Sequence, residues 1–183
     1  ISSFKKLFMQ LSKGANSGQS TIDILGRKIA FEDSANDIIH FSADVIFNSP
    51  RSSSDYIELS REFHTIFISN LNVIDEEDTA RRFIAFIDEC YDRNVKVIFL
   101  SNPLPYEIYT GKRLADKFQR TLSRLTEMQS NDYLQGRHKG WFFSQSPHKK
   151  DVRMKLSMKE LIETNYSIGQ VVRHKYLDFR GVI

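Results

Sequence analysis

Two pairs of arginines are the residues of this 183-residue chain whose type and spacing could do chemistry. Arg81 and Arg82 are adjacent early in one helical pattern, and Arg120 and Arg124 lie one turn apart in another. A guanidinium group binds phosphate oxygens through two parallel hydrogen bonds, so each pair could stabilise phosphate charge across an interface. Surface charge and salt bridging, for example to Glu127, is the alternative explanation. The sequence therefore makes all four arginines candidates for sensing a nucleotide.

The segment Gly14–Thr21 comes nearest to a loop that could hold the phosphates directly. Such a loop needs two glycines five positions apart, followed by Lys and Ser/Thr, between a strand and a helix. Here Gly14 and Gly18 are four apart, Gln19 stands in place of the lysine, and a hairpin pattern follows instead of a helix. We therefore expect that this chain alone neither hydrolyses ATP nor binds it tightly.

No catalytic residue and no metal site is predicted. The five histidines are scattered, and none has a second ligand at the spacing that zinc sites use. There is no Gly-x-Ser-x-Gly elbow, although a triad assembled from distant residues stays open. Cys90 is the single cysteine and falls in a helical pattern, which favours a small buried side chain over a nucleophile. A single cysteine cannot form an internal disulfide, so a reduced intracellular compartment is expected.

The arginine pairs belong to a strand, helix, strand, helix order. His64–Ile68 and Val95–Leu100 are β-branched and aromatic runs, typical of strands covered on both faces. Apolar residues recur at helical spacing between them, with Asp75 as the cap, and again over Leu114–Met128. This order predicts an α/β fold with a βαβ unit and a short parallel sheet flanked by helices. One core is expected to hold Phe67, Phe83, Ile87, Ile98, Phe118 and Leu125.

The N-terminal part supplies the remaining elements. Alternating residues on either side of Gly26-Arg27 predict a β-hairpin. The other expected elements are a helix over Phe4–Leu11 ending near Gly14, hairpin strands over Thr21–Leu25 and Lys28–Glu32, a third strand over Asp37–Phe41, a helix capped by Ser52–Asp55 that buries Tyr56, Leu59 and Phe63, and a short helix from Pro105.

Charge divides the chain into two parts, although its net charge is only +3. Residues 135–183 carry ten Lys/Arg and four Asp/Glu, against sixteen and nineteen in residues 1–134. We expect an α/β portion over residues 1–134 and a basic tail over 135–183, weakly structured or docked. In the tail, Lys159–Thr164 favours a helix, Gln170–Val172 favours a strand, and Trp141-Phe142-Phe143 could dock on the domain or anchor a partner. The basic patch is Lys139, Lys149, Lys150, Arg153 and Lys155.

The termini and the hydropathy of the chain limit its class. No run approaches 18 apolar residues without a charge, so no transmembrane span is predicted. The N-terminus lacks the charged and apolar segments of a secretory signal. The chain begins at Ile1 rather than Met, and we expect it to be a fragment of a longer protein.

The arginine-bearing segments contain two long motifs. Asp78–Lys96 reads Asp-x-Ala-Arg-Arg-Phe-Ile-x-x-Ile-Asp-x-x-Tyr-Asp-x-x-Val-Lys, and Phe118–Tyr133 reads Phe-x-Arg-Thr-x-Ser-Arg-Leu-x-Glu-Met-Gln-Ser-x-x-Tyr. Both motifs resemble patterns of the ZapE-type cell-division ATPases of bacteria and their mitochondrial relatives, the lactation-elevated-type ATPases. The resemblance covers roughly residues 4–134, and residues 135–183 do not align. Three shorter motifs also agree: Leu25-Gly26-Arg27, Asp55-Tyr56 and Phe63-His64-Thr65.

The resemblance implies an AAA-like P-loop ATPase whose phosphate-binding loop and metal-binding strand precede Ile1. ATP and Mg are then expected for the parent protein only. This chain would be a C-terminal regulatory or partner-binding part, which meets the N-terminal ATPase half, further copies of the protein and a protein client. Its setting would be cell division in the bacterial cytoplasm or protein quality control in the mitochondrion. The alternatives are a non-enzymatic binding module whose basic tail meets nucleic acid or an acidic surface, and a hydrolase of unrecognised type.

Overall fold

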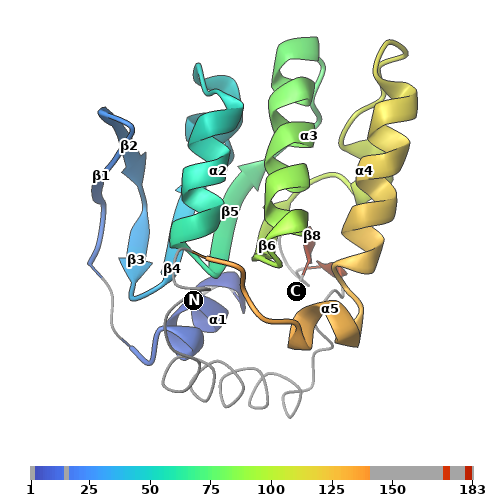
Figure 1. The fold of residues 1–183 in the computed structure, drawn as a ribbon. Helices are drawn as coiled ribbons and strands as arrows, with labels where there is room; N and C mark the ends of the chain where they lie inside the picture. The colour runs from blue at the N-terminus through green and yellow to red at the C-terminus, as the bar shows by residue number, and fades with distance from the viewer. Residues whose placement is uncertain (1–2, 15–16, 141–170, 174–179, 183) are drawn as a thin grey trace.

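The computed structural model describes residues 3–14, 17–140, 171–173 and 180–182 and contains both helices and strands (Figure 1). In chain order the elements are α1 (Ser3–Leu11), β1 (Ser20–Ile24), β2 (Arg27–Phe31), β3 (Asp33–Ala35), β4 (Ile38–Ser42), the π-helix η1 (Asp44–Asn48), α2 (Ser53–Glu62), β5 (Thr65–Leu71), α3 (Glu77–Asp92), β6 (Lys96–Ser101), the 3₁₀-helix η2 (Pro105–Glu107), α4 (Ala115–Glu127), α5 (Asn131–Gln135), β7 (Val171–Arg173) and β8 (Arg180–Val182).

A mixed sheet with the strand order β3-β4-β5-β6-β8-β7 forms the centre of the fold. Strands β4, β5 and β6 are parallel, and their register places Phe67 of β5 opposite His40 of β4 and Ile98 of β6. β3 is antiparallel to β4, and β8 is antiparallel to both β6 and β7. β1 and β2 form a separate antiparallel hairpin. These observations confirm the predicted α/β class, its short parallel sheet and its N-terminal hairpin.

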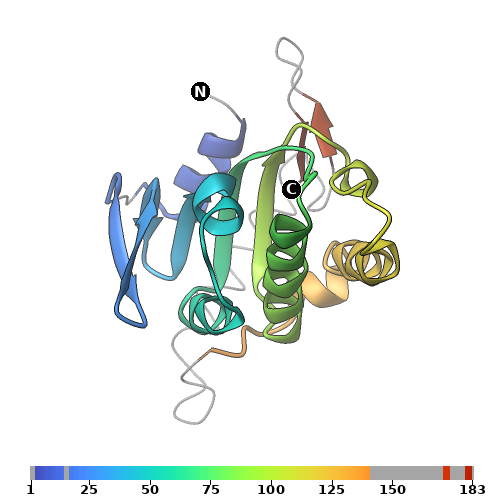
Figure 2. The same ribbon diagram turned by 90° about the horizontal axis from the view of Figure 1, so that it is seen from above.

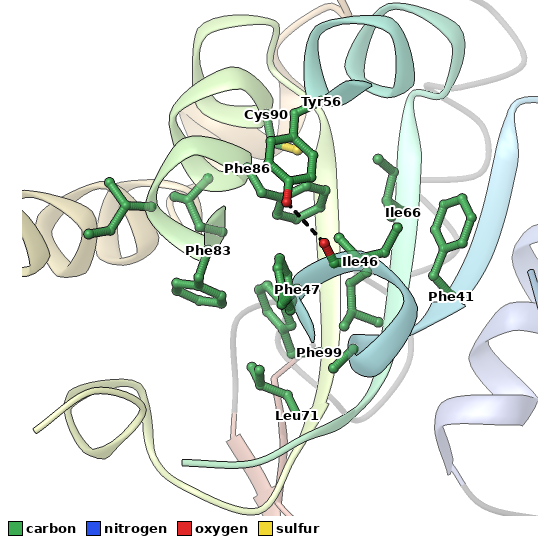
Figure 3. Close-up of a cluster of buried hydrophobic side chains, with 14 of the residues drawn as sticks. Phe41, Ile46, Phe47, Tyr56, Ile66, Leu71, Phe83, Phe86, Cys90 and Phe99 are labelled. Atoms are coloured by element: carbon green, nitrogen blue, oxygen red, sulfur yellow. Dashed lines mark hydrogen bonds between the residues drawn. The ribbon is translucent and has the colours of Figure 1, made fainter. Parts of the chain in front are cut away.

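Helices α2, α3 and α4 lie side by side on one face of the sheet, and α1 lies on the other (Figures 1 and 2). Both crossovers between the parallel strands therefore use helices on the same face. The core beneath these helices is aromatic: the ring of Phe47 lies 5.2 Å from Phe83 and 5.4 Å from Phe86, and all three rings are fully buried. Figure 3 shows this cluster.

The prediction of one shared core was wrong for Phe67 and Ile98. Phe83 belongs to the large cluster under the helices, as do Ile87, Phe118 and Leu125, whereas Phe67 and Ile98 pack with Phe8 on the other face. Successive side chains of a strand point to opposite faces, so a strand buried on both sides feeds two cores. The rings of Phe4 and Phe8 of α1 each meet Phe67 edge-on at 5.2 Å.

Several boundaries also differ from the prediction. The hairpin turn is Leu25-Gly26, with φ of 54° and 76°, and Arg27 already begins β2. Glu76 rather than Asp75 is the N-cap of α3. No pattern in the sequence predicted η1. The expected strand at Gln170–Val172 is present as β7, one residue further on, whereas Lys159–Thr164 lies outside the described residues.

Candidate functional site

Arg120 and Arg124 of α4 both bind Asp88 of α3. Nη2 of Arg120 lies 2.7 Å from Oδ2 of Asp88, and Arg124 pairs with the other carboxylate oxygen. Arg124 also has its second nitrogen 3.9 Å from Asp92, and its guanidinium lies 4.8 Å above the ring of Tyr91. The side chain of Arg120 is 60% exposed and that of Arg124 is 21% exposed. One aspartate therefore holds both arginines in the seam between α3 and α4.

Acidic groups outnumber the guanidinium groups in this seam. The hydroxyl of Tyr91 donates a 2.7 Å hydrogen bond to Glu127, and this bond, with burial and the Glu127 charge, raises the pKa of Tyr91. Glu127, the partner expected from the sequence, thus binds the tyrosine instead of either arginine. Asp88, Asp92 and Glu127 thus give this seam three carboxylates for two guanidinium groups. In the described arrangement the seam is an ion-pair network between helices, and an anion would reach the arginines only by displacing Asp88.

Arg81 and Arg82 do not act as a pair, because adjacent residues on a helix point in different directions. Arg81 is exposed and lies 3.8 Å from Glu77 one turn earlier. Arg82 is half-buried, and its Nη1 donates a 2.6 Å hydrogen bond to the main-chain oxygen of Phe47 in η1. The structure therefore gives Arg82 a structural partner and leaves Arg81 at the surface.

Three side chains fix the carbonyl groups of η1. Besides Arg82, Nε of Arg51 donates to the carbonyl of Val45 at 3.2 Å, and the hydroxyl of Tyr56 donates to that of Ile46 at 2.9 Å (Figure 3). Burial raises the pKa of Tyr56, while the charges of Arg82 and Arg51 oppose the rise. π-Helices are rare and are often found at functional sites. Here, external donors stabilise the π-helix at the carboxyl end of β4.

The motifs Leu25-Gly26-Arg27 and Asp55-Tyr56 meet beside η1. Arg27 forms an ion pair with Asp55, whose side chain is fully buried. Asp55 also accepts a 2.7 Å hydrogen bond from the main-chain nitrogen of Ser52 and so closes the capping box at the start of α2. The matched motifs therefore fix one corner of the fold, formed by the hairpin turn, η1 and the start of α2.

At the opposite edge, the side chain of Lys96 is buried, with Lys96 only 5% exposed. Its Nζ donates to the carbonyls of Asn94 at 2.9 Å and Gly136 at 2.6 Å, and it lies 5.4 Å from the ring centre of Tyr133. Burial lowers the pKa of Lys96 to about 7. The sequence did not single out Lys96, although it ends the first family pattern.

The segment 133–139, which we call the strap, covers the carboxyl end of α3. The hydroxyl of Tyr133 bonds the carbonyls of Cys90 and Val95 at 3.1 and 3.0 Å. The main-chain nitrogen of Lys139 donates a 2.9 Å hydrogen bond to the Arg93 carbonyl, and its Nζ donates a 3.2 Å hydrogen bond to the Asp92 carbonyl. Lys139 of the predicted basic patch thus has structural partners. The other basic and aromatic candidates of the tail lie outside the described residues: Lys149, Lys150, Arg153, Lys155 and Trp141-Phe142-Phe143.

The described part of Gly14–Thr21 binds a carboxylate of its own chain. The main-chain nitrogens of Ser17 and Gly18 both lie 3.2 Å from Oδ1 of Asp33, and strand β1 follows. Within the described residues there is no group of three or more potential metal ligands. No helix among those described is long and apolar enough to cross a membrane.

The winding of the sheet bears on ligand binding. In open α/β sheets, ligands bind at the carboxyl ends of the strands, where successive connections leave toward opposite faces. Here α2 and α3 follow two successive parallel strands and lie on the same face (Figure 2). The connections of β4, β5 and β6 therefore do not create the ligand-binding crevice that arises where two successive connections leave toward opposite faces.

The fold and the site define an α/β unit whose arginines and buried lysine bind groups of the unit itself. Comparison with known proteins gives its family: residues 1–137 match the AFG1-like ATPases, and the chain belongs to this family. It is 42% identical over 135 residues to the cell division protein ZapE of Escherichia coli K12, covering 73% of this chain. It is 28% identical over 146 residues to the lactation elevated protein 1 homolog B of Danio rerio, covering 61% of this chain.

These relatives are much longer than the matched segment. The chain spans 36% of the length of E. coli ZapE and 29% of the length of the Danio rerio protein. An uncharacterized protein of Schizosaccharomyces pombe, C115.02c, is 31% identical over 93 residues. No solved structure matches the chain significantly.

Proposed function

We propose that this chain is the C-terminal regulatory or partner-binding part of an ATP-hydrolysing AFG1-like protein. Membership of the family over residues 1–137 and the 36% coverage of ZapE support this proposal. ATP and Mg would bind to the remainder of the protein, which supplies the phosphate-binding loop. Further copies and a protein client are the other proposed partners, in bacterial cell division or in mitochondrial protein quality control. The bacterial cytoplasm and the mitochondrion are the matching locations.

The shared binding of Arg120 and Arg124 by Asp88 is the observation that carries a role for nucleotide. Like the Asp88 carboxylate, a phosphate group offers anionic oxygens that accept hydrogen bonds from arginine, and it carries more negative charge. Exchange of Asp88 for phosphate would release α3 from α4, which would couple the nucleotide to the packing of the helices. Arg82 is less suited, because its guanidinium already binds the carbonyl of Phe47.

ATP turnover in full-length E. coli ZapE tests this role. The positions aligned with Arg120 and Arg124 are replaced by Ala, and the position aligned with the 83% exposed Arg113 serves as the matched control. If one arginine contacts transferring phosphate, turnover falls by roughly 10³-fold or more, with the greater effect at Arg124. Near-normal turnover in both variants would refute the role. The isolated chain should show no magnesium-dependent ATP hydrolysis.

A second candidate function rests on charge. The ten Lys/Arg and four Asp/Glu of residues 135–183 favour contact with nucleic acid or an acidic surface. Binding of a DNA or RNA duplex to the whole chain, measured against salt concentration, tests it. Duplex binding that weakens as the salt concentration rises, and that is lost when residues 141–183 are removed, would support this function.

A further inference from the structure

The large hydrophobic side chains exposed among the described residues all lie at one edge of the sheet. Leu25 is 58% exposed, Val73 47% and Tyr106 64%. Val73 follows the carboxyl end of β5, and Tyr106 lies in η2, just after the carboxyl end of β6. Leu25 lies in the hairpin turn, which Arg27 ties to the start of α2 at the same edge. We call the surface of Leu25, Val73 and Tyr106 the carboxyl edge.

Leu25 is unfavourable in two ways. Its φ of 54° lies in the left-handed region, where a Cβ atom crowds the following carbonyl. Two-residue turns of this kind prefer Asn or Gly at that position, and an exposed leucine gains no burial in return. Strained residues cluster at binding sites, so the combination of strain and exposure indicates that this side chain contacts something outside the described residues.

The loops that carry Val73 and Tyr106 are held together before any partner binds. Nδ2 of Asn102 donates to the side chain of Asn72 at 2.5 Å, and the main-chain nitrogen of Ile74 donates to the carbonyl of Ile108 at 2.7 Å. An ordered surface loses less conformational entropy when it binds.

Carboxylates border the apolar residues of this edge. Asp75, Glu76 and Asp78 are exposed and lie within five residues after Val73. Among the described residues their side chains form no ion pair or hydrogen bond, although they suit the positive end of the α3 dipole. A complementary surface would be apolar and carry Lys or Arg.

We infer that the carboxyl edge is the surface on which the nucleotide-binding remainder of a longer AFG1-like protein docks. This inference rests on the proposed function. Most of the length of ZapE lies outside the matched segment, so a domain-sized partner in the same polypeptide is available. The hairpin and η2 lie at opposite sides of the molecule in Figure 2, a span that suits a domain better than a peptide. At the opposite edge of the sheet, Lys96 at the start of β6 already binds the Gly136 carbonyl of the strap.

Cross-linking in full-length E. coli ZapE tests the inference. A photoreactive benzoyl-phenylalanine replaces, one at a time, the residues aligned with Val73 and Tyr106, with the position of the exposed Gln119 on α4 as the control. Both edge positions should cross-link to residues outside the 135 matched ones, and the control should not. A mixture of ¹⁴N- and ¹⁵N-labelled protein separates cross-links within one polypeptide from those between copies. Cross-links only between copies, or only within the matched residues, would overturn the inference.

Sedimentation of this chain provides the second measurement. The wild-type chain should remain monomeric, and Leu25→Asp and Tyr106→Asp should keep its sedimentation coefficient. Tyr106→Asp should keep its melting temperature, and Leu25→Asp should not lower it, because aspartate tolerates the left-handed conformation better than leucine. If the chain instead dimerises and Tyr106→Asp abolishes the dimer, a second copy occupies the edge and the inference is wrong. Edge cross-links together with unchanged turnover in the Arg120 and Arg124 variants of ZapE would leave the docking intact and refute only the role of the arginines.

Discussion

Arg82 donates a 2.6 Å hydrogen bond to the main-chain oxygen of Phe47, 35 residues earlier in the chain. This bond joins α3 to the π-helix after β4, and it places a cation at the carboxyl end of that helix. Arg82 and the neighbouring Arg81 therefore differ in their structural contacts, although the sequence presents them as a pair.

Replacing Arg82 with Ala should lower the free energy of unfolding by about 1–3 kcal/mol, because the Phe47 carbonyl loses its charged donor in a half-buried setting. Arg81→Ala should change it by less than about 1 kcal/mol, as is usual for an exposed ion pair. Urea unfolding of both variants measures the difference. Equal effects would show that the bond to Phe47 adds nothing to stability.

Asp88→Ala should destabilise the chain more than Arg120→Ala does. It removes both ion pairs of the seam and leaves the less exposed Arg124 without its main partner, at a cost of about 1–3 kcal/mol. Arg120→Ala should cost less than about 1 kcal/mol. A double-mutant cycle between Asp88 and Arg124 gives the coupling energy, and a value near zero would contradict a structural role for the seam.

Lys96 should make the free energy of unfolding rise as the pH increases above about 7. Its pKa is lowered by burial to about 7 in the folded chain, against 10.5 ordinarily. Between these values the unfolded chain binds more protons, so stability should rise with pH by at most about 1.4 kcal/mol per pH unit. Lys96→Met should remove this rise. Unfolding of both proteins at several values between pH 7 and 10 measures it, and parallel curves would contradict the lowered pKa.

Leu25→Asn should stabilise the isolated chain by about 1 kcal/mol, since asparagine tolerates the left-handed conformation better than leucine. Leu25→Ala is the matched control, because it removes the exposed side chain and keeps the unfavourable conformation. Thermal unfolding compares the two variants with the wild type. If alanine stabilises as much as asparagine, backbone strain is not the cause.

The sequence predicted which helices and strands form better than it predicted which side chains contact one another. Continuous β-branched and aromatic runs predicted the two strands of the βαβ unit, and helical periodicity predicted the helix between them. The pattern could not assign Phe67 to a separate core, because a strand buried on both faces shows no alternation. η1 has only five residues, too few for a periodic pattern.

Spacing along a helix revealed only local neighbours of the arginines. Glu127 was considered because it lies three and seven positions from Arg124 and Arg120, whereas Asp88 is 32 positions from Arg120 and meets it only through the packing of α3 on α4. Lys96 was overlooked for the same reason, since its partner Gly136 is 40 positions away.

The strap decides where this unit can be cut. A polypeptide shortened to end at Leu134 would lose the Gly136 carbonyl that Lys96 binds and both donors of Lys139. The end of α3 would then expose carbonyls without partners, beside a buried ammonium group with one acceptor fewer. Expression fragments and protease-resistant cores of this protein should therefore extend through Lys139, beyond the point where the helical pattern of the sequence fades.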